Sequence, residues 1–453
     1  MQFYNKFNAA ERRVWSNASE NPKMRSVRRC DIGRRHRMGG TNNNGKLIVS
    51  SLTSQTAIAP PPPTLEARAT LLTISMMTVM AGAIVAPALP QIEAAFAAFP
   101  DSDLLAKLVL AIPALAIAVF APLSGVLVDR FGRRRLMLIG LGLYALSGTT
   151  GMYLSDPYPI LAGRLGLGVA IALMMTTSTT LISDYFAGAE RARFLGLQAS
   201  FMGLGGVLFL PLGGQLATMN WHAPFAVYVA ALPLLYAAWL YLPEPPRITT
   251  DPIPGRAIDE PMPIPWPTVL MLYFVGLSAM VAFYLGPVQV PFHMKSLYGA
   301  EPTKSSFAIA AITLAGVVTS LFYGRIAKRI AAPWILVILY ALVGCGHVIT
   351  GTANIEFFTW LGLIVCGFGS GLMIPTLSTW MMRISPNRFR GRLTGGMMSA
   401  IFVGQFVSPI LVRPLVYNGG TSRAFEVIGY AMLGLCVVFF VGAMRVRKTP
   451  ATI

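Results

Sequence analysis

The sequence predicts an all-α integral membrane protein with twelve transmembrane helices in two parallel repeats of six. Its composition is the first indication. Of the 453 residues, 55% are hydrophobic and only 12% are charged, whereas a soluble globular protein carries about 25% charged residues. The mean hydropathy is +0.61. Charges gather in short loops between apolar runs of about 20 residues, the length at which a helix crosses a bilayer core.

Twelve such runs follow one another along the chain. Because backbone groups in lipid must bond within their own segment, each run should be a helix. Their limits are 69–91, 106–128, 136–154, 159–183, 194–217, 222–242, 266–289, 305–327, 332–352, 356–380, 393–415 and 424–444. The segment 243–265 is polar and rich in proline, which indicates a cytoplasmic linker. The predicted halves are therefore 67–242 and 266–446, with a short tail at 447–453.

The first 66 residues differ from the rest. Residues 1–38 hold ten Lys or Arg against three acids, and a run of four prolines follows at 60–63. Low apolar content and high charge predict a disordered tail. Such a tail could be a basic arm on anionic lipid, a plain unstructured segment, or upstream sequence before a true start at Met24 or Met38.

Loop charge predicts the orientation. Loops after the even-numbered spans are rich in arginine, for example at 130–135 and 383–392, and loops after the odd-numbered spans are poorer. Lys and Arg mark the cytoplasmic side of a membrane protein. Both termini should therefore be cytoplasmic.

An internal repeat predicts the arrangement of the halves. The stretch Gly125-Val-Leu-Val-Asp129-Arg130-Phe-Gly-Arg matches Gly324-Arg-Ile-Ala-Lys328-Arg after a shift of 199 residues. At the same shift, Gly168 meets Gly367, and the pair of arginines at 191 and 193 meets the pair at 390 and 392. Six spans per half place matching loops on one face, so the halves are parallel repeats about an axis along the membrane normal.

The loop between spans two and three resembles the signature of the major facilitator superfamily, and the resemblance covers about residues 67–447. It rests on Gly125, Asp129, Arg130, Gly132, Arg133 and Arg134. It implies alternating access around a site near the midplane, lined by spans one, four, seven and ten. It also implies a cytoplasmic gate between this motif and the start of span eleven, near 392–394. Lys328 replaces the acid in the second copy, so the gate is expected in the first half only; the alternative is a loop that only sets topology.

Four polar residues within spans are transport-path candidates: Arg164, Gln198, Tyr284 and Gln405. Arg164 resembles the arginine of the superfamily's span-four motif, which implies a role in coupling or in binding an anionic substrate. Because an arginine inside a span is costly, it normally faces a cavity or a partner. The alternative is that it snorkels to the outer surface. The two amides also need a partner when they are removed from water.

The predicted spans hold no Asp or Glu in their middles. Coupling to protons normally needs an accessible group that changes charge, and arginine cannot lose its proton. The candidates are therefore Glu93, Asp184 and His293, or the substrate itself.

Together these observations predict a monomeric secondary transporter of the bacterial inner membrane, with the bilayer and a small molecule as partners. Our first hypothesis is export of amphipathic compounds in exchange for protons. The alternatives are uptake or exchange of an organic metabolite, anionic if Arg164 holds it, and, more distantly, a non-transporting sensor. The net charge of +18 lies beside the spans and does not indicate nucleic acid. The Cys and His residues show no metal spacing, so we expect no cofactor. An enzyme would need a cluster of titratable residues, and the sequence shows none, so we do not expect an enzyme.

Overall fold

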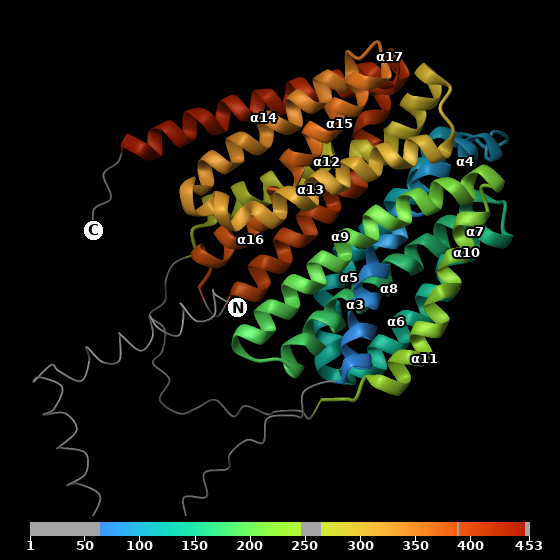
Figure 1. The fold of residues 1–453 in the computed structure, drawn as a ribbon, viewed down its shortest axis with the longest axis vertical. Helices are drawn as coiled ribbons and strands as arrows, with labels where there is room; N and C mark the ends of the chain where they lie inside the picture. The colour runs from blue at the N-terminus through green and yellow to red at the C-terminus, as the bar shows by residue number, and fades with distance from the viewer. Residues whose placement is uncertain (1–63, 246–263, 387–388, 449–453) are drawn as a thin grey trace, which may run out of the picture. The chain divides into compact units, whose positions relative to one another are not determined.

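The computed structural model describes residues 64–245, 264–386 and 389–448, all within the compact unit Pro60–Ile453. Every regular element in this described part is a helix (Figure 1). The basic tail and most of the predicted linker lie outside the described residues, so the predictions for them stay predictions.

The first half contains six spans, three of which are broken into shorter pieces. Span one ends at Ala83 and resumes at Ala86, next to Pro87. The elements are α3 (Leu65–Ala83), η1 (Ala86–Ala88), α4 (Leu89–Ala95), α5 (Ser102–Phe131), α6 (Arg133–Gly148), α7 (Thr150–Tyr153), α8 (Pro157–Tyr185), α9 (Gly188–Met219), α10 (Ala223–Ala226), η2 (Val227–Ala230) and α11 (Ala231–Tyr241).

The second half also contains six spans. Its elements are α12 (Trp266–Tyr298), α13 (Pro302–Arg329), α14 (Ala332–Gly351), α15 (Glu356–Ser370), α16 (Met373–Ile384) and α17 (Arg390–Lys448). In the described chain, 11 helical segments are long and apolar enough to cross a membrane. The last of them, α17, is 59 residues long and has non-helical angles at Gly420. It is therefore two helices that meet at this glycine, and the prediction of twelve spans is confirmed.

The two halves repeat the same helix contacts. A Cβ atom on Gly168 of α8 would lie 2.3 Å from the carbonyl oxygen of Pro113 in α5. A Cβ atom on Gly367 of α15 would lie 2.4 Å from the carbonyl oxygen of Ile312 in α13. Both members of the second contact are 199 residues after those of the first. Only glycine permits such a close approach of two helices, so the sequence repeat is also a repeat in three dimensions.

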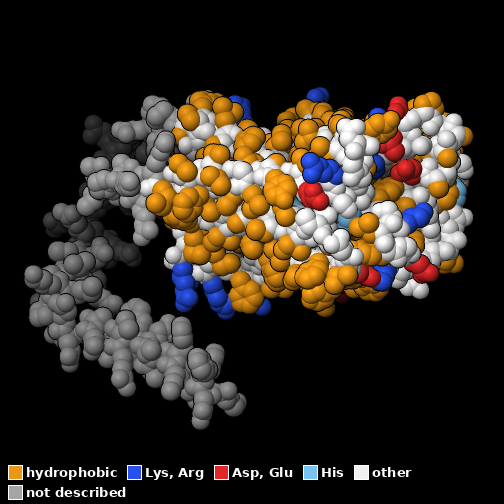
Figure 2. Space-filling model, turned by 90° about the horizontal axis from the view of Figure 1, so that it is seen from above, with side chains coloured by type: hydrophobic (Ala, Val, Ile, Leu, Met, Phe, Trp, Pro, Cys, Tyr) orange, Lys and Arg blue, Asp and Glu red, His pale blue; other side chains and the backbone are white. Residues whose placement is uncertain are grey.

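Hydrophobic side chains cover much of the face shown in Figure 2. Leu146 and Leu321, for example, are 68% and 66% exposed. A soluble monomer rarely exposes such large apolar areas, whereas lipid chains solvate them.

The bundle has two distinct ends. The connections at 131–133, 185–188, 329–332 and 384–390 lie at one end. We call it the basic end, because arginines lie in or beside these connections, including Arg133, Arg191, Arg329 and Arg390. The opposite end carries the connections at 96–101, 154–156, 299–301 and 352–355, together with Gly420.

Candidate transport site

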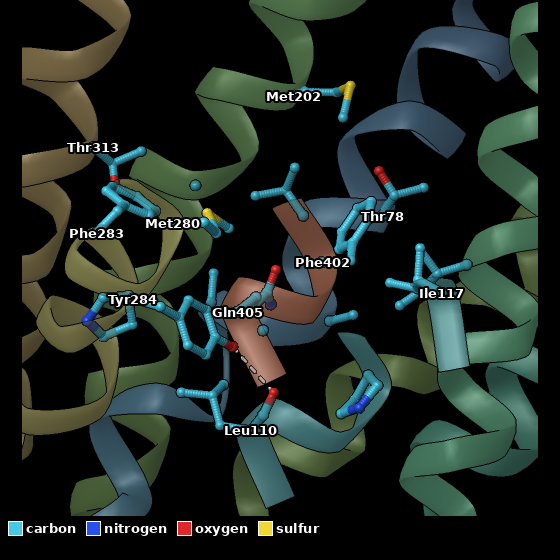
Figure 3. Close-up of a pocket in the computed structure, with 18 of the residues that line it drawn as sticks. Thr78, Leu110, Ile117, Met202, Met280, Phe283, Tyr284, Thr313, Phe402 and Gln405 are labelled. Carbon is cyan, nitrogen blue, oxygen red and sulfur yellow. Dashed lines mark hydrogen bonds between the residues drawn. The ribbon is translucent and has the colours of Figure 1, made fainter. Parts of the chain in front are cut away.

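A cavity of about 270 Å³ lies between the two halves (Figure 3). Its walls come from α3, α5, α8 and α9 of the first half and from α12, α13 and α17 of the second. They are Thr78, Val79, Ala81, Gly82, Ala83, Leu110, Pro113, Ile117, Ile171, Met175, Met202, Gly206, Leu210, Met280, Phe283, Tyr284, Pro287, Ile309, Thr313, Phe402 and Gln405. The expected contributions of spans one, four and seven are present. Span ten (α15 and α16) adds no lining residue, which differs from the sequence prediction.

The cavity wall carries few polar groups and no formally charged side chain among its lining residues. Its side-chain hydroxyl and amide groups belong to Thr78, Thr313, Tyr284 and Gln405. The hydroxyl of Tyr284 donates to the carbonyl oxygen of Leu110 over 3.0 Å, which joins the second half to the first. Gln405 lies beside Tyr284 at the same part of the wall (Figure 3).

The halves meet from the middle of the bundle to the opposite end. Arg413 of α17 donates to both carboxylate oxygens of Asp103 in α5 at 3.1 Å, and it also contacts Asp101. Between α9 and α13, a Cβ atom on Gly214 would lie 2.3 Å from the Ser306 hydroxyl oxygen.

Nearer the basic end, these helices carry glycines that have no neighbouring atoms. Five glycines there would meet no other atom within 4 Å if they carried a Cβ atom. They are Gly125, Gly196, Gly324, Gly391 and Gly395. Helices α5, α9, α13 and α17 are therefore uncovered at these positions, whereas the ion pairs of Arg413 join the halves at the opposite end.

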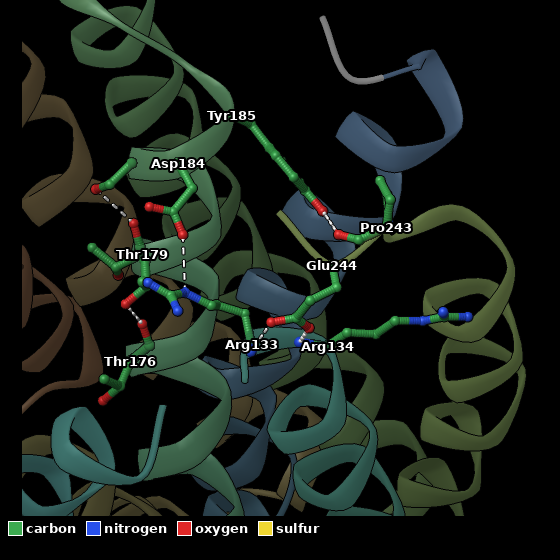
Figure 4. Close-up of polar contacts among 10 residues, drawn as sticks. Arg133, Arg134, Thr176, Thr179, Asp184, Tyr185, Pro243 and Glu244 are labelled. Carbon is green, nitrogen blue, oxygen red and sulfur yellow. Dashed lines mark hydrogen bonds and ion pairs between the residues drawn. The ribbon is translucent and has the colours of Figure 1, made fainter. Parts of the chain in front are cut away.

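The predicted gate motif is anchored within its own half (Figure 4). The carboxylate of Glu244 accepts the backbone N–H groups of Arg133 and Arg134, both over 2.7 Å. These donors have no partner inside α6, because they begin it, and a carboxylate also suits the positive end of a helix. Gly132 has φ 93°, and a Cβ atom there would lie 2.8 Å from Glu244. A glycine is thus required at this turn.

Side chains of the motif add two further anchors. The Nε atom of Arg133 donates to Asp184 at the end of α8 over 3.1 Å, and the guanidinium of Arg134 donates to the carbonyl oxygen of Trp239 in α11. Glu244 was not identified from the sequence, because it belongs to the predicted linker. Its position directly after span six was the available signal.

Asp129 and Arg130 are exposed at the end of α5. The Arg130 guanidinium lies 5.6 Å from the ring of Phe131. Among the described residues, no hydrogen bond or ion pair joins Asp129 to α17. The gate contact between this motif and span eleven therefore stays a prediction, for a conformation in which the basic end is closed.

Arg164 lies in the core of the first half and does not line the cavity. Its side chain is fully buried. Nε donates to the carbonyl oxygen of Val109 over 2.7 Å, Nη2 to that of Ala81 over 2.8 Å, and Nη1 to the hydroxyl of Tyr228 over 2.8 Å. Snorkelling to the surface is thus excluded for this structure, and so is contact with a molecule in the cavity.

The partners of Arg164 explain its position. Pro113 has no N–H group, so the carbonyl of Val109, four residues earlier, has no helical partner. Ala81 lies two residues before the end of α3, and its carbonyl oxygen also accepts from Tyr228 over 2.7 Å. The arginine satisfies carbonyls that the irregular parts of spans one and two leave without a partner.

Gln198 is also buried within the first half. Its amide donates to Ser75 over 2.8 Å and to Ser178 over 3.2 Å, between α9, α3 and α8. Of the four transport-path candidates, the structure brings Tyr284 and Gln405 to the cavity and places Arg164 and Gln198 in the surrounding core.

The three protonation candidates lie in three separate places. Asp184 is bonded to Arg133 at the basic end. Glu93 is half-buried in α4 near the opposite end. His293 is fully buried in the second half, with Nδ1 3.0 Å from the hydroxyl of Thr421. None of the three lines the cavity.

The sequence pattern described as Major Facilitator Superfamily matches residues 71–285 and 271–452. The chain belongs to this superfamily. The two matched segments begin in the first helix of each half and overlap within α12. This member of the major facilitator superfamily is a multi-pass membrane transporter.

Several curated relatives of this superfamily member are bacterial. It is 26% identical over 345 residues to the tetracycline resistance protein, class C, of Escherichia coli, which covers 72% of this chain and 84% of that protein. It is 22% identical over 313 residues to a probable sugar efflux transporter of Helicobacter acinonychis (strain Sheeba), covering 68% of this chain and 75% of that one.

Solved structures of transporters share the fold of this superfamily member. One is a bacterial homologue of the human lysosomal transporter Spinster, in an inward-facing and occupied conformation. Its TM-score is 0.71 at 13% identity, and the match covers 85% of this chain and 98% of that one. Another is a D-xylose–proton symporter, with a TM-score of 0.66 at 18% identity and coverage of 81% and 96%.

Proposed function

We propose that this transporter exports small amphipathic organic molecules across the bacterial inner membrane in exchange for protons. The observation that carries the proposal is the uncharged cavity between the halves. Six of its 21 lining residues carry thioether or aromatic side chains: Met175, Met202, Met280, Phe283, Tyr284 and Phe402. Such side chains adapt to apolar ligands of different shapes, and a few polar groups would orient the ligand.

The bacterial relatives support export over uptake. Those compared above are named for tetracycline resistance and for sugar efflux. The cavity suits the more apolar of these two classes, because its described wall offers only a few hydrogen-bonding side chains.

In this proposal the basic end faces the cytoplasm, because Lys and Arg concentrate there. The described conformation is then closed towards the outside by the contacts of Arg413 and Tyr284, and its helices part towards the cytoplasm. Rocking of the two halves would open the outer end. The motif around Asp129 would then meet the start of α17 and close the cytoplasmic end.

Uptake of an anionic metabolite held by Arg164 is less well supported. All three nitrogens of this guanidinium donate to protein groups in the core of the first half. An anion in the cavity would find no cationic lining side chain.

The test is transport by purified protein in proteoliposomes, with and without an imposed pH gradient. The panel contains tetracycline, a lipophilic dye, a sugar and an organic anion. We expect gradient-dependent movement of the first two. Phe402→Ala should weaken it, whereas Phe440→Ala, which alters a 44% exposed ring, is the matched control. Movement of the anion alone would contradict the proposal, and no movement of any compound would favour the sensor.

A further inference from the structure

Two histidines are buried together in the second half. His293 of α12 is 0% exposed and His347 of α14 is 1% exposed. Both rings pack against Phe425 in the second part of α17, with centroid distances of 5.1 Å and 5.6 Å. We call them the histidine pair. They lie away from the cavity wall, and transport chemistry within the cavity does not use them.

Each ring of the histidine pair has one bonded and one unbonded nitrogen. Nε2 of His347 lies 3.0 Å from the carbonyl oxygen of Ala282. Because a carbonyl only accepts, this nitrogen carries the hydrogen, and Nδ1 of the neutral ring is then an acceptor. That Nδ1 atom has no hydrogen-bond partner among the described residues, and Nε2 of His293 makes no well-aligned hydrogen bond there, although the backbone of Thr350 lies next to that ring.

Gln289 adds two more unbonded atoms. It precedes His293 by one helical turn, so both side chains lie on the same face of α12. Gln289 is 0% exposed, and within the described chain neither its Oε1 nor its Nε2 has a hydrogen-bond partner. A buried amide without a partner costs several kcal/mol. Four unbonded polar atoms on two histidines and one amide indicate an occupant that both donates and accepts, which fits water.

We propose that the histidine pair and Gln289 hold internal water and bind the coupling proton of the transport cycle; this rests on the proton exchange proposed above. The proton passes from water to the lone pair of a ring nitrogen and later returns to water. No bond between heavy atoms changes in this step. Both rings also contact the aromatic ring of Phe425.

The groups that surround the histidine pair are a thiol and an ion pair that is already formed. Cys366 of α15 faces it, with Sγ 3.6 Å from Nε2 of His347. Arg423 and Glu426 of α17 are nearby in the chain but pair with each other at 3.2 Å. In the part of the chain that the structure describes, no carboxylate forms an ion pair with either ring.

The site is within reach of the opposite end. Nδ1 of His293 contacts Thr421, which is partly exposed and directly follows the break at Gly420. A proton would thus enter from the end where the halves are closed. Substrate would enter from the basic end, so the two do not compete for one path.

Helix α12 links the proton site to the cavity. One of its faces contributes Phe283, Tyr284 and Pro287 to the cavity wall, and another carries Gln289 and His293. Pro287 leaves the carbonyl of Phe283 without its helical partner, so the helix can bend between the two regions. Charging a ring would change the packing of α12 against α14, and thereby the cavity wall.

The experiment replaces each ring by an amide that keeps the bonded nitrogen but cannot titrate. His293→Asn keeps a group near the position of Nδ1, and His347→Gln keeps one near Nε2. The matched control is His222→Gln, at the end of the first half. In proteoliposomes with tetracycline as the probe, we expect each site variant to lose pH-gradient-driven accumulation by about tenfold. Exchange of tetracycline across the same membranes, without a gradient, should persist.

A second measurement does not depend on transport. Nitrogen NMR of histidine-labelled protein in liposomes reports the charge of each ring, and the variants assign the signals. On acidification from about pH 8 to about pH 3, we expect at least one ring of the pair to become an imidazolium. Gln289→Leu should shift this transition, because it removes a partner of the water.

Two results would overturn the inference: both rings neutral throughout this pH range, or full gradient-driven accumulation by the double variant of the pair. If the wild type moves no test compound, the exchange function fails. The NMR titration still decides whether the pair binds a proton.

Discussion

Two polar side chains among the described residues of this transporter donate to carbonyl groups that a proline leaves without a partner. Arg164 bonds to Val109, four residues before Pro113. Ser399 of the second half bonds over 2.9 Å to the carbonyl oxygen of Ala118, four residues before Pro122. In lipid such carbonyls have no water to bond with. Hydrogen-bond donors from neighbouring helices take the place of water.

Arg164→Ala should lower the stability of the protein by on the order of 3 kcal/mol, because it removes three buried hydrogen bonds from a charged donor. Arg164→Lys should also lower the stability, since one ammonium group cannot reproduce the planar arrangement of donors. Thermal unfolding in detergent measures both. Arg423→Ala, at an exposed arginine, is the control. If the Arg164 variants unfolded at the normal temperature but transported poorly, Arg164 would act in transport itself and not only in stability.

Tyr284→Phe should slow transport while stability falls by only about 1 kcal/mol. The change removes one hydroxyl from the cavity wall and its bond to Leu110. The control is Tyr417→Phe, at a ring that is 89% exposed. Equal transport by the two variants would show that the hydroxyl contributes neither to binding nor to closure.

Sequence reasoning selected four path residues by polarity, and only Tyr284 and Gln405 reach the cavity. The position of Arg164 depends on Pro113 and on the break after Ala83, which lie in other helices. The position of Gln198 depends on two serines, likewise in other helices. A single sequence reveals that such groups need partners, but it does not reveal which helix supplies them.

Glycine sets how closely α9 and α13 approach across the two halves. A Cβ atom on Gly214 would lie 2.9 Å from the carbonyl oxygen of Pro302, as well as against Ser306. Backbone cannot yield as a flexible side chain does, so the contact would have to open.

Gly214→Ala should therefore destabilise the described conformation by about 1–3 kcal/mol through overpacking. Gly196→Ala, in the same helix but with open space around it, should be neutral or slightly stabilising. Thermal unfolding of the two variants compares them. Equal unfolding temperatures would mean that the close contact is not a feature of the protein in solution.

The helix limits were well predicted, because apolar runs and basic loops mark them directly. The prediction for the start of α6 was less complete. The sequence shows Gly132 and its arginines, but the partner that holds them, Glu244, comes from beyond span six. A contact between helix ends that are far apart in the sequence cannot be predicted from either segment alone.

The two ends of the bundle carry different closing contacts. At the opposite end, Arg413 joins the halves through Asp101 and Asp103. At the basic end, no ion pair joins the Asp129 carboxylate to α17 among the described residues. Each set would be made in one conformation and lost in the other.

Arg413→Gln should shift the population away from the described conformation. An exposed ion pair is worth up to about 1 kcal/mol, so we expect roughly a fivefold change in the ratio of states. Spin labels at Arg191 and Arg325, which are exposed near the basic end, report the distance between the halves. This distance should shorten in the variant.

Asp129→Asn should shift the population towards the described conformation, the opposite of the effect of Arg413→Gln. It should leave the labelled distance long and cut transport, because the basic end would close less well. The variant should still insert normally, since the arginines that set orientation remain. Unaltered transport would contradict the gate.

The arrangement of the halves followed from the repeat, and the structure confirms it at Gly168 and Gly367. The conformation did not follow, because both states use the same spans and loops. Only the contacts of particular side chains distinguish the states.

The hydrogen bond from Arg164 to a carbonyl that Pro113 leaves without a partner has a consequence for how the two residues vary among related proteins. If Pro113 were an alanine, the carbonyl of Val109 would regain its helical partner and one role of Arg164 would vanish. The loss of Arg164 should then cost less in a Pro113→Ala background than in the wild type. Among related transporters, we expect this proline and this arginine to be gained or lost together.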